Sequence, residues 1–203
     1  MLKNAVLGVA GLLLAAGVEQ AAAQQPDAAE MQKGLAAMMQ SVAAAASNSA
    51  PVVDFKELKA MLPAALTGLK RTSAKGERNG AMGMTVAQAT GEYTAEAGGS
   101  VRIELQDLGG LGMAGFAAAG WQALDVDSES DDGYEKTYKY KGIKVHEEYN
   151  TPGKSGELKT LVGGRFMVSI SVRDLDAAQL KNSLDKIDLA KLAALKPAAG
   201  AQK

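Results

Sequence analysis

Hydrophobic and polar residues alternate along several stretches of the chain between residues 81 and 173. One stretch sets three aliphatic residues among charged and polar ones: Val101, Ile103 and Leu105. Another stretch, after the turn residues Gly163 and Gly164, has an apolar residue at every second position: Phe166, Val168, Ile170 and Val172. A period of two is typical of strands with one buried and one solvated face. The pattern therefore predicts an antiparallel sheet, because parallel strands are usually buried on both faces.

A two-residue turn at Lys141 and Gly142 joins the runs YEKTYKY and IKVHEEY. This turn length sets the register of a hairpin. On one face the expected pairs are Tyr140 with Ile143, Tyr138 with Val145, Lys136 with Glu147, and Tyr134 with Tyr149, all favourable. On the other face Lys139 meets Lys144 and Glu135 meets Glu148, which is unfavourable. The hairpin is thus predicted with a register that one face supports and the other opposes.

Two segments with helical spacing flank the strands. In the first, Asp54 and Glu57 stand three residues apart, as in a capping pair, and Pro63 ends the apolar run that follows. In the second, one helical stripe carries three aliphatic residues: Leu180, Leu184 and Ile187. Asp188 is placed to cap a further helical turn after that stripe.

The order of these elements predicts the fold class. A helix precedes two strands, a glycine-rich insert, four strands and a closing helix, and the polar stretch at residues 72–80 is expected to be a loop. Because helices and strands do not alternate as in βαβ units, the fold is predicted to be α+β, with an antiparallel sheet of about six strands and helices on one face. We expect this single domain at residues 52–196 and a disordered tail at 197–203.

The first residues are typical of a cleaved export signal. Lys3 precedes an apolar run at residues 5–16, and three alanines favour cleavage after Ala23. The chain has no cysteine, which excludes a lipid anchor at the cleavage site, thiol catalysis and disulfides. Removal of Lys3 and Glu19 with the signal leaves the formal net charge at −1, so the basic field of a nucleic-acid-binding protein is missing. We expect a periplasmic or secreted protein without a transmembrane span in its mature form.

Residues 24–51 form a separate segment rich in alanine, methionine and glutamine. One face of the helix expected at residues 28–46 carries the apolar residues Met31, Leu35, Met38, Met39 and Val42. Such a helix fits a mobile tether, a helix docked on the domain, a weak homo-oligomer contact or a weak membrane-surface helix. Lys33 is its only basic residue, which argues against binding to anionic lipids.

Three glycines, Gly110, Gly112 and Gly115, spell G-x-G-x-x-G, the pattern of dinucleotide-binding turns. That site needs a buried parallel strand before the glycines and a further parallel strand after the helix. Here the preceding strand alternates and a tyrosine-rich hairpin follows. We therefore expect no cofactor and interpret the glycines as residues that let backbones pack closely.

Other apparent catalytic patterns also lack their context. Tyr140 and Lys144 spell Y-x-x-x-K, but a hairpin turn separates them. Ser183 and Lys186 spell S-x-x-K without the partner motifs of penicillin-binding enzymes, on the expected solvent side of a helix. His146 is the only histidine and is expected to be exposed without a role. No catalytic residue is predicted.

The stretch from Leu108 to Trp121 carries no charge and contains five glycines. It fits either a buried helix that covers the sheet or a mobile apolar flap over a ligand or partner groove. If a binding site exists, we expect it here. The candidate contact residues are Leu111, Met113, Phe116 and Trp121.

The most concentrated charge lies at residues 125–133, in the sequence DVDSESDDG. Carboxylates are hard oxygen ligands of the kind that Ca²⁺ prefers, so the weak metal-ligand candidates are Asp125, Asp127, Glu129 and Asp131. Against the calcium-loop pattern, Asp132 occupies the position that needs glycine and Tyr138 the position that needs glutamate. The expected structure is a solvated acidic loop without a metal.

Three stretches, VDFKELKAMLPAALTGLKRTSAKGERNGAMGM, DLGGLGMAG and DGYEKTYKYKGIKVHEEY, resemble parts of small exported bacterial proteins of unassigned function. The resemblance covers most of residues 52–195. It implies the same domain boundary and no activity, so it transfers no functional residue.

Together these features predict an exported, non-enzymatic module that binds a protein partner or an apolar ligand. One alternative is an exported hydrolase with a carboxylate-based site at residues 125–132. Another is a structural envelope protein that assembles through the helix at residues 28–46.

Overall fold

The structure is a computed structural model that describes residues 28–47, 49–81, 83–112 and 114–197. The chain divides into two units, Met1–Ala37 and Met38–Lys203. Helix α1 (Ala28–Ser47) spans the boundary between them, and the exposed side chains of Leu35 and Met39 lie on it. The predicted export signal, its cleavage after Ala23 and nearly all of the predicted tail lie outside the described residues. No helix in the described ranges has the length and apolar character needed to cross a membrane.

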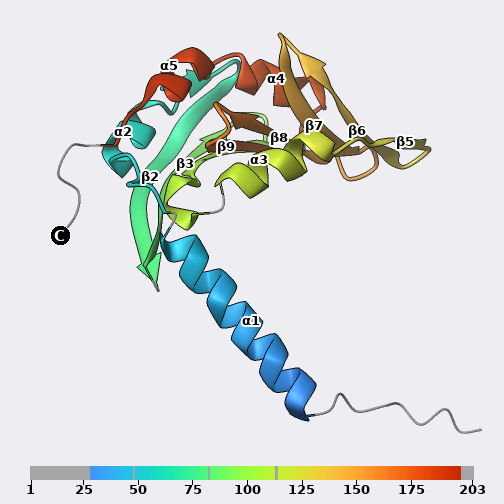
Figure 1. Ribbon diagram of the computed structural model, residues 1–203. Helices are drawn as coiled ribbons and strands as arrows, with labels where there is room; N and C mark the ends of the chain where they lie inside the picture. Colours follow the sequence, from blue (N-terminus) through green and yellow to red (C-terminus); the bar gives the residue numbers. More distant parts are fainter. Residues whose placement is uncertain (1–27, 48, 82, 113, 198–203) are drawn as a thin grey trace, which may run out of the picture. The chain divides into compact units, whose positions relative to one another are not determined.

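Nine antiparallel strands form one open sheet in the described part of the second unit, in the order β1-β2-β3-β4-β9-β8-β7-β6-β5 (Figure 1). Their bounds are β1 Ala65–Leu66, β2 Leu69–Ala81, β3 Met84–Thr94, β4 Ser100–Asp107, β5 Asp127–Ser130, β6 Gly133–Tyr140, β7 Ile143–Asn150, β8 Ser155–Val162 and β9 Phe166–Arg173. The chain thus builds two meanders, β1–β4 and β5–β9, which join where β4 pairs with β9. The predicted α+β class with an antiparallel sheet is confirmed.

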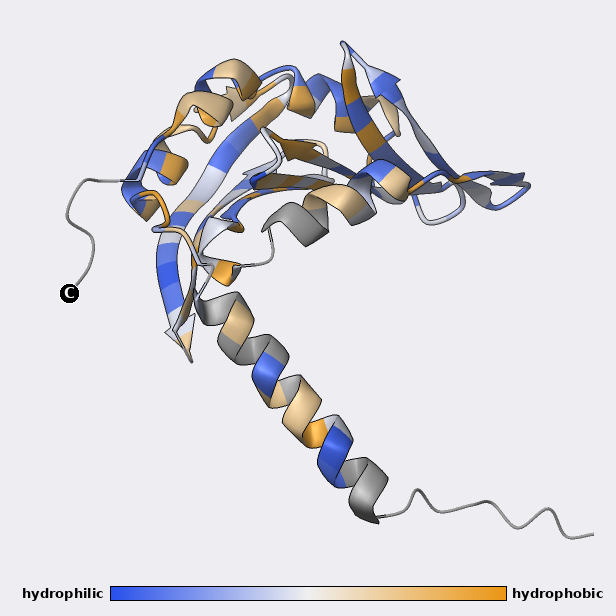
Figure 2. Ribbon diagram, viewed as in Figure 1, coloured by the Kyte–Doolittle hydropathy of each residue, from blue (hydrophilic) through white to orange (hydrophobic). Residues whose placement is uncertain are grey.

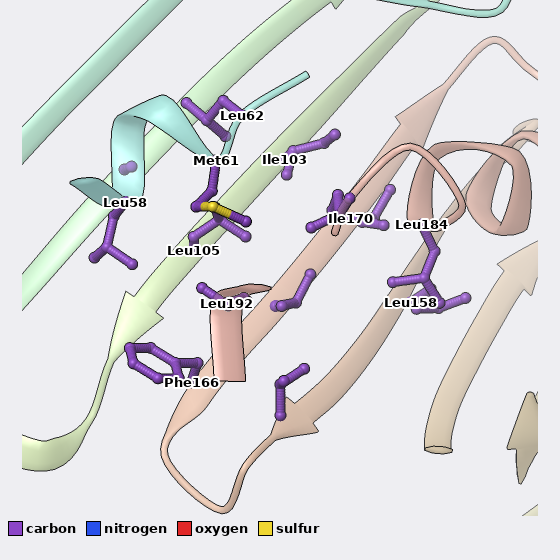
Figure 3. Close-up of a cluster of buried hydrophobic side chains, with 14 of the residues drawn as sticks. Leu58, Met61, Leu62, Ile103, Leu105, Leu158, Phe166, Ile170, Leu184 and Leu192 are labelled. Carbon is purple, nitrogen blue, oxygen red and sulfur yellow. The ribbon is translucent and has the colours of Figure 1, made fainter. Parts of the chain in front are cut away.

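One face of this sheet is buried under three short helices, α2 (Phe55–Ala60), α4 (Ala178–Leu184) and α5 (Leu189–Ala194). Figure 3 shows the side chains that meet there, with Ile103 and Leu105 from β4 and Ile170 from β9. The helices contribute Leu58, Leu184 and Leu192, which are at most 2% exposed. Each such side chain stabilises the fold by about 1.5–3 kcal/mol when it leaves water. The alternation in the sequence therefore identified the buried face correctly.

The helix starts and the hairpin register also agree with the sequence patterns. Asp54 accepts a hydrogen bond from the backbone N–H of Lys56 at 2.8 Å, and Asp188 accepts one from that of Lys191 at 2.9 Å. All the predicted hairpin pairs between β6 and β7 are present, including the unfavourable pair Glu135 and Glu148. The register is confirmed because a two-residue turn leaves no freedom to slip.

Two strands form where loops were expected. Strand β2 covers the polar stretch at residues 72–80, and β5 (Asp127–Ser130) covers the middle of the acidic stretch. Figure 2 shows β2 as mostly hydrophilic, and most of its side chains are exposed. Both strands form through backbone hydrogen bonds to a neighbour, β3 or β6, rather than through an apolar face. Hydrophobic alternation does not detect such strands, so the prediction of about six strands was wrong.

A short 3-10 turn, η1 (Gly109–Leu111), and helix α3 (Ala114–Ala123) follow β4. The side chain of Lys144 on β7 donates to the carbonyl of Gln122 at the end of α3, at 2.7 Å. Lys144 points away from the buried face, because its neighbour Val145 is buried there. Trp121 of α3 is buried but is not part of the main core cluster. Helix α3 therefore lies on the other face of the sheet, and the prediction of helices on one face is wrong for α3.

Asp107 joins the two meanders at the end of β4. Its fully buried carboxylate accepts hydrogen bonds from Arg165 Nε and Nη2, both at 2.7 Å, in a bidentate ion pair. It also accepts the backbone N–H groups of Val53 at 2.8 Å and Gly109 at 2.9 Å. Arg165 Nη2 further donates to the carbonyl of Pro51 at 2.7 Å. Because all these donors converge on one carboxylate, its burial is compensated.

We expect Asp107→Ala to lower the free energy of unfolding by about 3–5 kcal/mol, because Arg165 would lose its partner in a largely buried place. Denaturant unfolding followed by circular dichroism measures this change. Glu104→Ala on the same strand is the matched control, since its side chain lies on the other face; its effect should stay within about 0.5 kcal/mol. Equal effects of the two substitutions would contradict the role of the ion pair.

Candidate functional site

The face of the sheet opposite the core is polar and is covered by α3 only in part. We call it the open face; it carries, along one line across five strands, Glu135, Glu148, Glu157, Ser171 and Arg102. A large hollow of about 600 Å³ is lined mainly by this face. Two smaller hollows, of about 330 and 250 Å³, continue along it over β9, β4, β3 and β2. The open face is therefore the candidate binding surface.

Three glutamates, Glu135, Glu148 and Glu157, lie directly opposite one another on β6, β7 and β8; we call them the acidic row. Directly opposed residues have Cβ atoms about 4.5–5.5 Å apart, so like charges there destabilise the sheet. Glu135 is 2.9 Å from His146 Nε2, and Glu157 is 2.5 Å from Lys159 Nζ. The carboxylate of Glu148, between them, has no hydrogen bond or ion pair with any described residue.

The large hollow has a negative charge. The acidic row and Asp132 place four carboxylates in its lining, and Arg173 is its one cationic side chain, which makes a formal net charge of −3. Hydroxyl and amide side chains complete the polar lining: Ser128, Ser130, Ser155, Ser171 and Asn150. Such a surface is suited to cations and to hydrogen-bonding groups rather than to apolar molecules.

The acidic stretch at residues 125–131 contributes Ser128 and Ser130 to the lining of the large hollow. Its four candidate metal ligands, Asp125, Asp127, Glu129 and Asp131, are all exposed. Asp127 pairs with Lys136 and Glu129 with Tyr134, so both project to the face opposite the acidic row. Among the described residues, no group of three or more acidic or histidine side chains is placed to hold a metal.

The sequence contained one sign of the acidic row, the unfavourable pair of Glu135 and Glu148. It could not reveal Glu157, because β8 reaches this row only through its pairing with β7. His146, expected to be exposed and without a role, has a side chain that is only 14% exposed and pairs with Glu135. The expectation of an exposed side chain was wrong.

The structure describes the side chains of only two of the four predicted contact residues. Leu111 is half-buried in η1, and Trp121 is buried in α3. Met113 and the side chain of Phe116 lie outside the described residues. Trp121 is 9% exposed, and its indole Nε1 has no hydrogen-bond partner among the residues that the structure describes.

Two of the three motif glycines have structural reasons to be glycine. A Cβ on Gly110 would lie 2.1 Å from the carbonyl oxygen of Thr85, so β3 and η1 could not approach each other as they do. Gly112 has a φ of 64°, the left-handed conformation that glycine adopts without strain. Gly110 and Gly112 thus allow a tight turn between β4 and α3.

A second polar cluster lies on the core face at Glu147, whose side chain is fully buried. The hydroxyls of Tyr134 and Tyr138 both donate to its carboxylate, and Lys181 Nζ is 3.7 Å from it. Burial raises the pKa of both tyrosines well above the usual value, and the hydrogen bonds to Glu147 raise it further. The hydroxyls therefore keep their protons and act as donors that hold β6, β7 and α4 together.

Ser183 and Lys186 do not share a surface. Ser183 is fully buried, whereas Lys186 is exposed. The expectation that both residues face solvent was wrong for Ser183. The separation of the two side chains leaves the S-x-x-K pattern without the geometry that its chemistry requires.

No protein-family model, curated protein or solved structure matches this chain. The resemblance to small exported bacterial proteins stays a prediction.

We expect Gly110→Ala to lower the free energy of unfolding by about 1–3 kcal/mol or more, because the methyl group would overlap the Thr85 carbonyl. Gly120→Ala is the matched control: Gly120 lies in α3 with open space at its Cβ. There the substitution should raise stability by about 0.5–1 kcal/mol through a better helix propensity. If both substitutions changed the free energy of unfolding in the same direction, as measured by denaturant unfolding, the proposed role of Gly110 would be contradicted.

Stability should fall as the pH rises above about 10, the ordinary tyrosine pKa. Below that pH the tyrosines are protonated in both states; above it the unfolded chain releases protons first, so it binds fewer protons and is favoured. Tyr134→Phe/Tyr138→Phe should make this decrease shallower, whereas Tyr140→Phe, at an exposed hydroxyl, should change it less. Urea unfolding at several alkaline pH values, with tyrosinate absorbance, measures both effects. Native tyrosines that all ionise near pH 10 would contradict the raised pKa values.

Proposed function

We propose that this protein is an exported, non-enzymatic module that binds a protein partner on its open face, and that the bound segment of the partner is basic. The observation that carries the proposal is the acidic row with its unpaired Glu148 inside the large hollow. The proposed export to the periplasm or medium rests on residues 1–23. Weak self-association through residues 28–46 stays part of the proposal.

The acidic row costs stability in the free protein, because like charges are opposed across three strands. Local arrangements that weaken a fold are expected at sites of function, where a ligand compensates them. Cationic side chains inserted between the carboxylates would remove this repulsion. Binding of a partner rich in lysine or arginine is therefore favoured by charge complementarity and by the loss of repulsion between the carboxylates of the acidic row.

The shape of the surface supports a polypeptide partner. Neighbouring strands lie about 4.8 Å apart, so the acidic row extends over roughly 10 Å. An extended peptide with basic residues at alternate positions can place them along this row. The adjoining hollows over β9, β4 and β3 continue the surface and are lined by side chains such as Gln106, Ser169 and Thr90.

The cluster around Glu147 supports the proposed absence of catalysis. Its two tyrosines, Tyr134 and Tyr138, have strongly raised pKa values. At Glu147 the tyrosine hydroxyls hold their protons, and the carboxylate is fully buried beneath them. A general base needs access to substrate and a pKa near the working pH. The cluster fulfils a structural role instead.

We expect a synthetic peptide of alternating lysine and serine to bind at the large hollow, and the corresponding glutamate peptide not to bind. Glu148→Gln/Glu157→Gln should weaken binding of the lysine peptide about five- to tenfold, as expected for two partly exposed ion pairs. Glu148→Gln alone should not lower the free energy of unfolding, because it removes only repulsion, whereas Glu157→Gln also removes the ion pair with Lys159. Isothermal titration calorimetry at low and high salt measures the affinity.

The matched control is Glu57→Gln/Glu96→Gln, which removes the same charge from exposed positions away from the hollow. This variant should bind the lysine peptide with little change. Equal weakening in both variants would show a general charge effect and would count against a site on the open face.

A further inference from the structure

Within the described part of the chain, two buried polar groups on the side of the open face lack hydrogen-bond partners: the indole Nε1 of Trp121 and the hydroxyl of Thr137. Trp121 lies in α3 and is nine-tenths buried. Thr137 is opposite His146 in the pairing of β6 with β7, so it shares the face that α3 covers. A buried donor without a partner is unfavourable, and a ligand or water usually satisfies it.

Hydrogen bonds place both groups at one junction. The backbone N–H of Thr137 donates to the carbonyl of Val126 at 2.7 Å, five residues after Trp121. Lys144 Nζ donates to the carbonyl of Gln122, the residue next to Trp121, at 2.7 Å. The end of α3 therefore meets β6 and β7 where the two unpartnered groups lie.

The chemistry of the junction defines what would satisfy these groups. An indole N–H can only donate, and a threonine hydroxyl can donate, so both can bind one acceptor. Lys139 and Lys144 are directly opposed nearby; Lys139 has no partner among the described residues, and Lys144 bonds a neutral carbonyl. The third cationic candidate, His146, is already paired with Glu135. An anionic oxygen therefore fits better than a neutral one.

Apolar side chains adjoin these donors on the same face. Leu161 and Met167 are paired on β8 and β9, both half-buried, and Leu161 follows Thr160, whose partner on β7 is Val145. The indole ring of Trp121 adds a large apolar surface. The junction thus combines an apolar wall with donors and positive charge.

We propose that the junction beneath α3 is a binding site for an apolar molecule that ends in a carboxylate. The carboxylate oxygens accept hydrogen bonds from Trp121 Nε1 and Thr137 Oγ1, and the apolar part lies against Leu161 and Met167. This site differs from the acidic row in place and in charge, and it goes beyond the proposed binding of a basic partner.

A ligand beneath α3 would have to displace this helix. It carries no charged residue, so its displacement breaks no ion pair of its own. Gly112, in the left-handed conformation, precedes it and can act as a hinge. The bond from Lys144 to the Gln122 carbonyl holds its far end, and a carboxylate would offer Lys144 a charged acceptor in exchange.

Decanoate is the test ligand, and the fluorescence of Trp121, the only tryptophan, is the signal. We expect saturable quenching or a spectral shift with decanoate. Decanol, with the same chain and no carboxylate, should bind at least tenfold more weakly, and decyltrimethylammonium should not bind. Equal affinity for decanoate and decanol, or no response to decanoate, would overturn the proposal.

Thr137→Val separates a ligand site from a structural role of the hydroxyl. We expect about tenfold weaker binding of decanoate with an unchanged or higher Tm, because the valine removes an unpartnered group. Thr160→Val is the matched control: this buried hydroxyl donates to the Lys144 carbonyl at 2.8 Å. The control should lower the Tm by about 2–4 °C and leave decanoate binding unchanged.

Two results would refute the site. One is decanoate binding that Thr137→Val does not weaken. The other is a loss of Tm in Thr137→Val as large as in Thr160→Val, since the hydroxyl would then hold a structural partner, such as an enclosed water, in the free protein.

Discussion

The ion pair of Asp107 and Arg165 connects the parts of the fold that are far apart in sequence. It lies at the end of β4 and β9, the one place where the two meanders of described strands pair. Five hydrogen bonds, four to the carboxylate and one from Arg165 to Pro51, tie this end to the segment that leads into α2. The buried charges are thereby compensated, and α2 is held over the core face.

Covering one face of an open sheet leaves the other face to solvent and to ligands. The core face carries nearly all of the large buried apolar side chains, so the opposite face can hold charges close together. Glu148 illustrates the consequence: it lies between two other glutamates and has no partner among the described residues. Next to the acidic row on the same face, the buried hydroxyl of Thr137 has no hydrogen-bond partner among the described residues, and neither has the indole Nε1 of Trp121 in α3. The polar face therefore has two chemically different regions.

Local patterns predicted much of the fold because local physics controls it. Alternation identified β4 and β9, and the two-residue turn set the whole register of β6 and β7. The polar strand β2 escaped detection because its hydrogen bonds to β3, not its side chains, make it a strand. The hairpin register predicted two members of the acidic row, Glu135 and Glu148. The third member, Glu157, could not be predicted because it depends on the pairing of β8 with β7.

The sequence by itself determined the class of fold, the buried side of its apolar strands and the starts of two helices, because side-chain alternation, turn length and capping act over a few residues. Only the tertiary structure decided which distant charges became neighbours. The pairing of β7 with β8 brought Glu157 beside Glu148, and the chain's return from β9 to β4 brought Arg165 to Asp107. The face that α3 covers was likewise decided by packing, since an uncharged glycine- and alanine-rich helix carries little sidedness of its own.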